Sequence, residues 1–373
     1  MRRMLYLINM PWGYIKQRPQ FLAEQLSSYY QVSVFYKKSY RSSMLVQDET
    51  VGGLGVTELF KVPLEHHSLM ISGLNNRIFK HLLKEPLGES DIVWLTDPEL
   101  YAPISDILPE GKFLVYDCMD DALEFPRRKT NRSLYERIFD LEKRLCERSD
   151  LILVTSDRLR KVLVERYQTE SDKVVLVSNA VSLEEEASVA DTGDDHVMMG
   201  ILKKIDKLQN KITYIGCIAD WFDSELIMAS LGELKEITYV LVGINEVKIP
   251  NHERIVHLGP IEHRFLYRIM QESDLLVMPF KLNELILSTN PVKLYEYVYS
   301  AKPCIAVKYG ETLKFQDYIY LYGDREEYLS LLARFVDGDL PPKKSPEECM
   351  RFAEANTWQE RAFSVQRAIE SLL

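Results

Sequence analysis

Short, uninterrupted apolar runs alternate with amphipathic stretches along most of the first half of the chain. Apolar residues at helical spacing predict helices over residues 17–28 and 133–148. The apolar runs predict strands at residues 5–9, 32–36, 92–96, 113–116, 151–154 and 174–177. Because strands that are apolar at successive positions are buried on both faces, this half predicts a parallel sheet covered by helices on both sides.

The pattern lapses between about Leu183 and Asp206, where the string SLEEEASVADTGDD is acidic and has no aromatic residue. We interpret this part as a linker. A second series follows, with strands at residues 212–215, 238–242, 254–258, 275–278 and 304–307, and helices from 223, over 263–272, from 290 and over 347–373. We therefore predict an α/β fold of two doubly wound, Rossmann-like domains, 1–185 and 205–354, that face a central cleft. A last helix, about 355–373, is expected to pack back on the first domain.

Length and composition fit this picture. The 373 residues suffice for two domains, and 46% hydrophobic and 27% charged residues are typical of a soluble globular protein. A formal net charge of −10 argues against nucleic-acid binding, which needs a basic face. Basic residues cluster locally at Arg127, Arg128, Lys129 and Arg132. Such a cluster is either a solvated face or a contact with an anionic membrane surface or a phosphate-bearing acceptor.

The five cysteines are widely spaced and form no C-x-x-C pair, which suits a reducing compartment. The apolar run in the N-terminal string MRRMLYLINM is too short for the core of a signal peptide or for a membrane span. We therefore expect a cytoplasmic protein, with peripheral contact at the inner face of the plasma membrane left open.

The string STNPVKLYEY, residues 288–297, holds the strongest candidate chemistry. Pro291 suits the first turn of a helix, and the polar residues before it suggest exposed backbone N–H groups that attract an anion. Lys293 opposes the helix dipole unless an anion binds there, and Glu296 shares its helix face and could bind a ribose diol. These features suggest a nucleotide-diphosphate site. The alternative is an ordinary strand–loop–helix unit with a surface Lys–Glu pair.

Four strings in chain order resemble GT-B glycosyltransferases of the teichuronic-acid type (TuaH-like). They are Trp12 with KQRPQ at 16–20, VYDCMDD at 115–121, IGCIADWFD at 215–223 and NPVKLYEYVYSAKP at 290–303. The resemblance implies a sugar-nucleotide donor held mostly by the second domain, an acceptor facing the first, and no cofactor or obligatory metal. The sequence shows no H-E-x-x-H, and the VYDCMDD string does not contain the D-x-D of metal-dependent transferases.

Carried over position by position, the resemblance implies that Glu296 binds the ribose hydroxyls. The other implied donor-binding residues are Gly216, Asp220, Trp221, Ser288, Thr289, Asn290 and Lys293. Gly216 is equally well explained as a turn glycine, and Trp221 as a half-buried core residue. Two-glutamate relatives carry a further glutamate where Ser288 stands, and the basic residues that commonly follow the first strand of the second domain are missing. Lys293 is therefore expected to carry the diphosphate charge alone.

On the acceptor side the resemblance points to Trp12, Arg18 and Asp117. If transfer inverts the anomeric centre, a carboxylate must accept the proton of the attacking hydroxyl, and Asp120 is the best candidate. The alternative is that Asp117, Asp120 and Asp121 are all turn and cap residues. No histidine, including His66, His67 and His263, competes convincingly for the role of base.

The expected function is transfer of a sugar from a nucleotide-diphosphate donor, UDP-linked in our interpretation, to a cell-surface polysaccharide or a lipid-linked oligosaccharide. Two alternatives remain at this point: a sugar-nucleotide 2-epimerase of the same fold, and an inactive binding protein.

Overall fold

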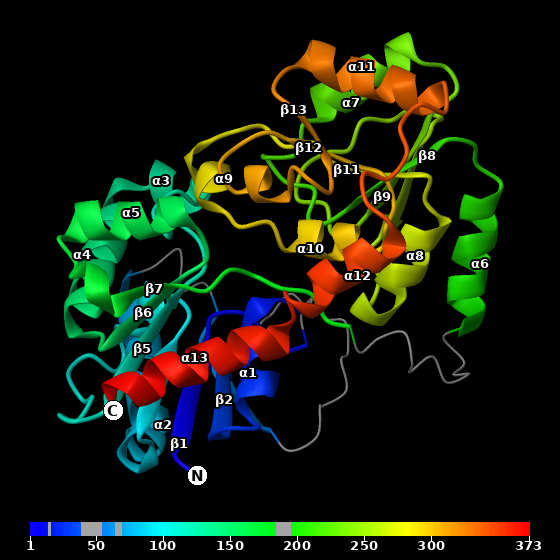
Figure 1. Cartoon of the computed structure of the whole chain (residues 1–373). Coiled ribbons are helices and arrows are strands. Elements are labelled where there is room, and N and C mark those ends of the chain that lie inside the picture. Colours follow the sequence, from blue (N-terminus) through cyan, green and yellow to red (C-terminus); the bar gives the residue numbers. More distant parts are fainter. Residues whose placement is uncertain (14–15, 39–53, 64–68, 184–194) are drawn as a thin grey trace. The chain divides into compact units, whose positions relative to one another are not determined.

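A computed structural model describes residues 1–13, 16–38, 54–63, 69–183 and 195–373. The chain divides into two compact units (Figure 1). Unit 1 comprises Met1–Ser178 together with Trp358–Leu373, and unit 2 comprises Asn179–Thr357. The division falls seven residues before the end of the predicted first domain at 185, and the C-terminal helix belongs to unit 1. His66 and His67 lie outside the described residues.

Unit 1 is built on a seven-stranded parallel sheet of order β3-β2-β1-β4-β5-β6-β7. Its strands are β1 Arg3–Ile8, β2 Gln31–Lys37, β3 Gly55–Leu59, β4 Ile92–Leu95, β5 Phe113–Cys118, β6 Leu151–Val154 and β7 Val174–Leu176. Its helices are α1 Arg18–Leu26, α2 Leu69–Glu89, α3 Pro126–Thr130, α4 Arg132–Arg148, α5 Asp157–Tyr167 and α13 Trp358–Leu372, with short 3₁₀ turns η2 Pro98–Leu100 and η3 Ser171–Lys173.

Unit 2 contains a six-stranded parallel sheet of order β10-β9-β8-β11-β12-β13. Its strands are β8 Lys211–Ile215, β9 Thr238–Val242, β10 Ile255–Gly259, β11 Leu275–Met278, β12 Cys304–Val307 and β13 Tyr320–Tyr322. Its helices are α6 Asp195–Asp206, α7 Ser224–Glu233, α8 Leu266–Glu272, α9 Glu284–Ser288, α10 Val292–Tyr299, α11 Arg325–Val336 and α12 Pro346–Glu354, with 3₁₀ turns η5 His263–Phe265 and η6 Thr312–Phe315.

Both sheets have the strand order of doubly wound nucleotide-binding folds, so the predicted fold class is confirmed. Every predicted strand is present within two residues at each end. The inner strands β4, β6, β11 and β12 are buried at every residue, as expected for a sheet covered on both faces, whereas β2 and β10 are only partly buried.

The final helix α13 lies along α1 in unit 1 (Figure 1). The ring of Trp358, at its start, stacks on Phe21 with centroids 5.1 Å apart and an interplanar angle of 7°. Trp358, Ala362, Val365 and Ile369 form its buried stripe. The chain therefore returns to the first sheet after it has completed the second.

Several elements were not expected from the sequence. The linker interpretation is wrong from Asp195 onward, because α6 is helical and buries Met198 and Ile205 in the core of unit 2. Its apolar positions are spaced for a single packed face, which the acidic string before it obscures. The strands β3 and β13 and the helices α2, α3, α5, α9 and α11 were also missed.

Helix α2 was missed because its pattern is mixed. It contains Pro86 and leaves Met70 84% exposed, so it lacks a clean apolar stripe.

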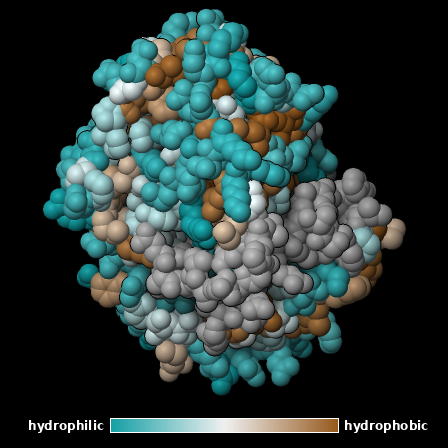
Figure 2. Space-filling model, turned by 90° about the vertical axis from the view of Figure 1, so that its right-hand side faces the viewer, coloured by the Kyte–Doolittle hydropathy of each residue, from teal (hydrophilic) through white to brown (hydrophobic). Residues whose placement is uncertain are grey.

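On the face shown in Figure 2, hydrophilic residues predominate over the described surface, and apolar residues lie in smaller groups among them. Within the described ranges, no helix is both long and apolar enough to cross a bilayer.

Candidate functional site

The predicted donor residues of unit 2 flank the point where the strand order reverses. Gly216, Asp220 and Trp221 follow β8, and residues 288–296 lie between β11 and β12. β8 and β11 are neighbours in the sheet, although β9 and β10 lie between them in the sequence. In open α/β sheets, ligands bind beyond the carboxyl ends of the strands at such a reversal. Unit 2 thus gathers most of the predicted donor residues at one topologically favoured edge.

Glu296 is the centre of a buried polar cluster in this unit. Glu296 lies on the second turn of α10 and is only 4% exposed. The Lys293 ammonium donates to Glu296 Oε2 at 2.7 Å, which confirms that the two side chains share a helix face. His263 Nε2, in η5, lies 2.9 Å from Glu296 Oε1. Both carboxylate oxygens therefore have a nitrogen partner.

These partners keep Glu296 ionised. Burial alone raises the pKa of a carboxyl, but the Lys293 ammonium and the His263 imidazole more than compensate, and the pKa of Glu296 falls from 4.5 to about 2. An ionised carboxylate only accepts hydrogen bonds, so His263 Nε2 must carry the hydrogen that it donates. Each carboxylate oxygen keeps a second lone pair, which could accept a hydroxyl of a ligand.

In the sequence analysis His263 was considered only as a catalytic base and dismissed, so its contact with Glu296 was missed. It lies 33 residues before Glu296 and no local spacing links the two. They share the lining of a small cavity of about 20 Å³, together with Leu266, Tyr299 and others. That volume suits about one water molecule.

The start of α10 differs from the expectation. The helix begins at Val292, with Pro291 as an N-cap that makes no side-chain hydrogen bond. Thr289 N–H donates to Ile286 O of the preceding helix α9, at 3.0 Å. The prediction of an exposed backbone N–H is therefore wrong at Thr289, and no side chain of the polar run caps α10.

Asn290 is used within unit 2. It is 1% exposed, and its amide Nδ2 donates to Glu311 Oε2 at 2.7 Å. Its Oδ1 accepts from Asn179 N, and its backbone oxygen accepts from Asn179 Nδ2. Ser288 is likewise buried at 1%. These contacts fix the loop that precedes α10, and phosphate contact by Ser288, Thr289 and Asn290 stays a prediction.

Two glycines bring the strand ends of unit 2 close together. A Cβ on Gly243 would lie 2.0 Å from Gly216 O, and Gly243 has φ +136°. A Cβ on Gly216 would lie 2.7 Å from the Tyr214 hydroxyl. Ile215 N–H donates to the Tyr297 hydroxyl oxygen of α10 at 2.9 Å, so the helix of Glu296 is tied to the residue before Gly216. Glycine at 216 is therefore required by local packing, whatever its role toward a phosphate.

The loop after β8 presents Asp220 and Trp221. Asp220 is exposed, and Trp221 is half-buried against the core of unit 2. The loop is held by Lys281 N–H, which donates to Trp221 O at 2.7 Å, and by a bridge between Phe222 and Phe280 after β11. The loop after β8 is therefore joined to the segment after β11. Donor contact by Asp220 and Trp221 stays a prediction.

In unit 1 the three aspartates after β5 differ in environment. Asp117 is 0% exposed and Asp121 is 3% exposed. Asp121 accepts from both Arg166 guanidinium nitrogens at 2.7 Å, and its Oδ1 accepts from Leu123 N–H at 3.2 Å. Asp120 is partly exposed, which makes it the aspartate of this string whose carboxylate is most open to a substrate.

Arg18 and Asp117 form a buried ion pair. Arg18 Nη2 and Nε donate to Asp117 Oδ1 at 2.8 and 3.0 Å, and Nη1 donates to Val177 O at 2.7 Å. With Arg18 only 2% exposed, the pair joins α1 to the ends of β5 and β7. Trp12 is also buried, at 7%. The geometry gives Arg18 and Asp117 a structural role, and acceptor contact by these three residues stays a prediction.

The basic cluster of α3 and α4 is largely paired. Arg128 is buried and donates to Asp97 and Glu99, Lys129 contacts Glu124, and Arg132 contacts Glu136. Its charge is therefore mostly compensated locally. Among the described residues, no group of three or more His, Cys, Asp or Glu side chains is placed to hold a metal ion.

Two units with doubly wound parallel sheets and a C-terminal helix returning to the first give this chain the GT-B fold. It is similar over its full length to the HepE protein of Anabaena, solved in complex with UDP-glucose, with a TM-score of 0.73, 12% identity and 100% of both chains covered. It is also similar to sucrose-phosphate synthase from Thermosynechococcus elongatus, with a TM-score of 0.75, 12% identity, and 100% and 99% of the chains covered. At these identities the likeness establishes the fold alone.

One curated relative comes from Bacillus subtilis and is provisionally named a teichuronic acid biosynthesis glycosyltransferase, TuaH. It is 24% identical over 260 residues, which cover 66% of this chain and 63% of the relative's length. This relative is of the type that the four sequence strings resemble. No protein-family model matches the sequence.

Proposed function

We propose that this protein is a glycosyltransferase that moves a sugar from a UDP-linked donor to a cell-surface polysaccharide or to a lipid-linked oligosaccharide precursor. The observation that carries the proposal is the buried, ionised Glu296, held by Lys293 and His263 at the strand reversal of unit 2. The GT-B fold, which HepE shares in its complex with UDP-glucose, and the similarity to the Bacillus protein support it.

In this proposal Glu296 accepts hydrogen bonds from the two ribose hydroxyls of the nucleotide. A carboxylate is suited to this because it accepts without donating, and its free lone pairs can receive both hydroxyls. His263 and Lys293 hold the carboxylate ionised and fix its orientation. His263 is thereby assigned a positioning role toward the donor.

Lys293 has a second role in the proposal. Its side chain is 24% exposed, so the ammonium can reach solvent while it contacts Glu296. Negative charge develops on the diphosphate as the sugar departs, and a fixed cation stabilises that charge. Since Ser288 occupies the position of the first glutamate in two-glutamate relatives, we assign no second carboxylate to the donor site.

Asp120 is proposed as the base that accepts the proton of the attacking acceptor hydroxyl in an inverting transfer. Asp120 is partly exposed, whereas Asp117 and Asp121 are buried, which supports this choice. No metal or cofactor is required in this scheme, because Lys293 supplies the charge at the leaving group. Peripheral membrane contact has little support, since the basic cluster near α3 is mostly paired.

A thermal-shift screen against UDP-, GDP- and dTDP-sugars tests the donor. A ligand that binds only the folded protein raises the unfolding midpoint, so UDP-sugars should raise it at the lowest concentration. Positive donors are then incubated with and without extracted lipid-linked glycan. Transfer that depends on the extract supports the proposal, whereas an epimer formed from donor alone would indicate the 2-epimerase. No shift with any nucleotide sugar would contradict a donor site.

A further inference from the structure

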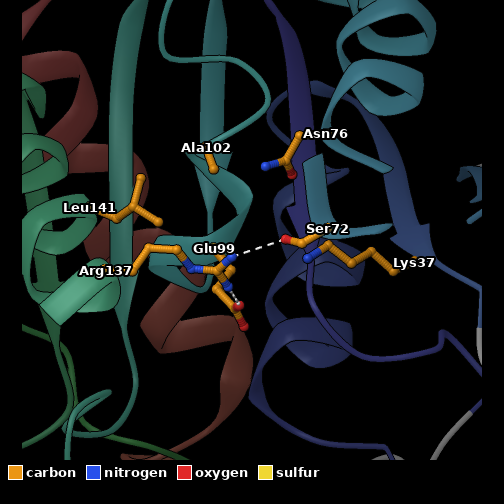
Figure 3. A pocket seen from close by; sticks show the side chains of 7 residues that line it. All are labelled: Lys37, Ser72, Asn76, Glu99, Ala102, Arg137 and Leu141. Carbon is orange, nitrogen blue, oxygen red and sulfur yellow. Dashed lines mark hydrogen bonds and ion pairs between the residues drawn. The ribbon is translucent and has the colours of Figure 1, made fainter. Parts of the chain in front are cut away.

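Unit 1 contains a second polar pocket, separate from the residues assigned above (Figure 3). It is lined by Lys37, Ser72, Asn76, Glu99, Ala102, Arg137 and Leu141, and has a volume of about 120 Å³. That volume is several times what one water molecule needs. The lining comes from the end of β2, the first turns of α2, η2 after β4, and α4. The end of β2 and the η2 turn place the pocket at the carboxyl edge of the sheet, where ligands bind in such folds.

The two carboxylates near this pocket are already engaged. Arg137 Nη2 donates to Glu99 Oε1 at 2.8 Å, and Arg128 Nη2 donates to Glu99 Oε2 at 3.1 Å. Arg128 also contacts Asp97 Oδ2 at 2.7 Å. Burial alone raises the pKa of Glu99, but Lys37, Arg128 and Arg137 lower it below its ordinary value, so Glu99 remains ionised. A carboxylate bound by two guanidinium groups is a poor base for a substrate hydroxyl.

Three hydrogen-bond donors of the pocket, in contrast, have no acceptor among the described residues. With respect to the described residues, the Lys37 ammonium has no hydrogen bond or ion pair at contact distance, although it lies 5.8 Å from the centre of the Phe79 ring. The Asn76 amide likewise has no hydrogen-bond partner among the described residues. Arg137 Nε is buried without a partner among the described atoms, while its Nη1 donates to Ser72 Oγ at 2.9 Å.

The local charge is positive. Lys37, Arg128 and Arg137 carry three positive charges against the two negative charges of Asp97 and Glu99. Lys37 and Asn76 are half-buried, whereas Arg137 Nε is buried, and a buried donor without an acceptor is costly. A ligand that supplies acceptor oxygens and one negative charge would satisfy the Lys37 ammonium and the Asn76 amide together. A neutral sugar hydroxyl would satisfy them less well, because it brings no charge.

We propose that the pocket of Lys37, Asn76 and Arg137 in unit 1 binds an oxyanion, a phosphate or carboxylate group carried by the acceptor. The assignment to the acceptor rests on the proposed transferase function, whereas the binding of an oxyanion does not. The assignment to the acceptor implies that the acceptor carries a negative charge near the hydroxyl that receives the sugar.

The test is titration calorimetry of the full chain with inorganic phosphate, with glucuronate, and with neutral glucose at the same ionic strength. Lys37→Met removes the cation of the pocket lining that has no ion-pair partner among the described residues. Lys38→Met is the matched control, because it removes the same charge one residue away, from a side chain paired with Glu58 at 3.0 Å outside the pocket. Lys293→Met removes the cation of the proposed donor site and separates the two sites.

Phosphate or glucuronate should bind the wild type more tightly than glucose, and the tighter of the two identifies the group. Loss of one charge-assisted hydrogen bond should weaken this binding about tenfold or more in Lys37→Met and leave it unchanged in Lys38→Met, whereas Lys293→Met should remove only phosphate bound at the proposed donor site. The inference is overturned if neither anion binds better than glucose, or if Lys37→Met binds them as well as wild type. Because the donor is assayed separately with UDP, failure of this pocket and failure of the donor site are distinguishable.

Discussion

The buried Glu296 should make the stability of unit 2 depend on pH in a defined window. Its pKa is about 2 in the folded protein and 4.5 ordinarily, so at about 1.4 kcal/mol for each pH unit the ionised form contributes about 3 kcal/mol relative to the protonated one. Because the folded pKa is the lower one, this contribution is fully present above about pH 4.5 and is lost as the pH falls toward 2. Both partners are less than one-third exposed, so solvent screens the interaction little.

The variant Glu296→Gln isolates this contribution. Its amide resembles the protonated carboxyl in shape and lacks the charge that Lys293 and His263 stabilise. We expect it to be less stable than wild type by about 3 kcal/mol at pH 7 and by only about 1.5 kcal/mol near pH 3. Many other carboxylates titrate in this range, but their effects cancel in the difference between the two proteins.

The assay is urea unfolding followed by far-UV circular dichroism at pH 7, 5, 4 and 3, with the free energy of unfolding extrapolated to water. Glu236→Gln, at an exposed carboxylate of the same unit, is the control and should show no comparable pH-dependent difference. Lys293 and His263 would not be holding the Glu296 carboxylate ionised if Glu296→Gln and wild type differed in free energy of unfolding by the same amount at pH 7 and pH 3. That result would refute the proposed role of the two partners.

Three further predictions concern the catalytic base, the glycine contact and the metal requirement. Asp120→Asn should lower transfer by about 100-fold or more while UDP affinity stays at the wild-type value; full turnover would remove Asp120 as the base. Gly243→Ala should lower the stability of unit 2 by about 1–3 kcal/mol in thermal unfolding, because the new Cβ would meet Gly216 O at 2.0 Å, whereas Gly310→Ala, with nothing within 4 Å, should be nearly neutral. Transfer should persist in excess EDTA, and a loss restored by Mg²⁺ or Mn²⁺ would contradict the metal-independent scheme.

The parts of the fold that local patterns encode were predictable. Strands such as β4 and β6 are short apolar runs bounded by polar residues, and their burial follows from that pattern alone. The Lys293–Glu296 pair was predictable for the same reason, since residues three apart meet on one side of a helix. The missed helix α2 has Pro86 in its interior and exposed apolar residues, so tertiary packing overrides its weak local signal.

The parts that depend on distant contacts were not predictable from the sequence. His263 reaches Glu296 from another element, and no spacing rule links positions 33 residues apart. The polar run before α10 was expected to face a phosphate, yet Asn290 is bound by Asn179, 111 residues away, and by Glu311. Arg18 and Asp117 are likewise joined across 99 residues, in a buried ion pair that no local pattern predicts. A sequence pattern places such residues on an edge of the sheet but does not say what they bind there.

Calorimetry with UDP and with 2′,3′-dideoxy-UDP, on wild type and Glu296→Gln at pH 7, tests the central claim most directly. Hydrogen bonds to a charged group contribute about 1.5–3 kcal/mol each, so Glu296→Gln should bind UDP about tenfold to 100-fold more weakly than wild type. The dideoxy nucleotide lacks the ribose diol and should bind both proteins equally weakly. Equal UDP affinity in the two proteins, or an equal loss with both nucleotides, would contradict the assignment of Glu296 to the ribose of a nucleotide-sugar donor.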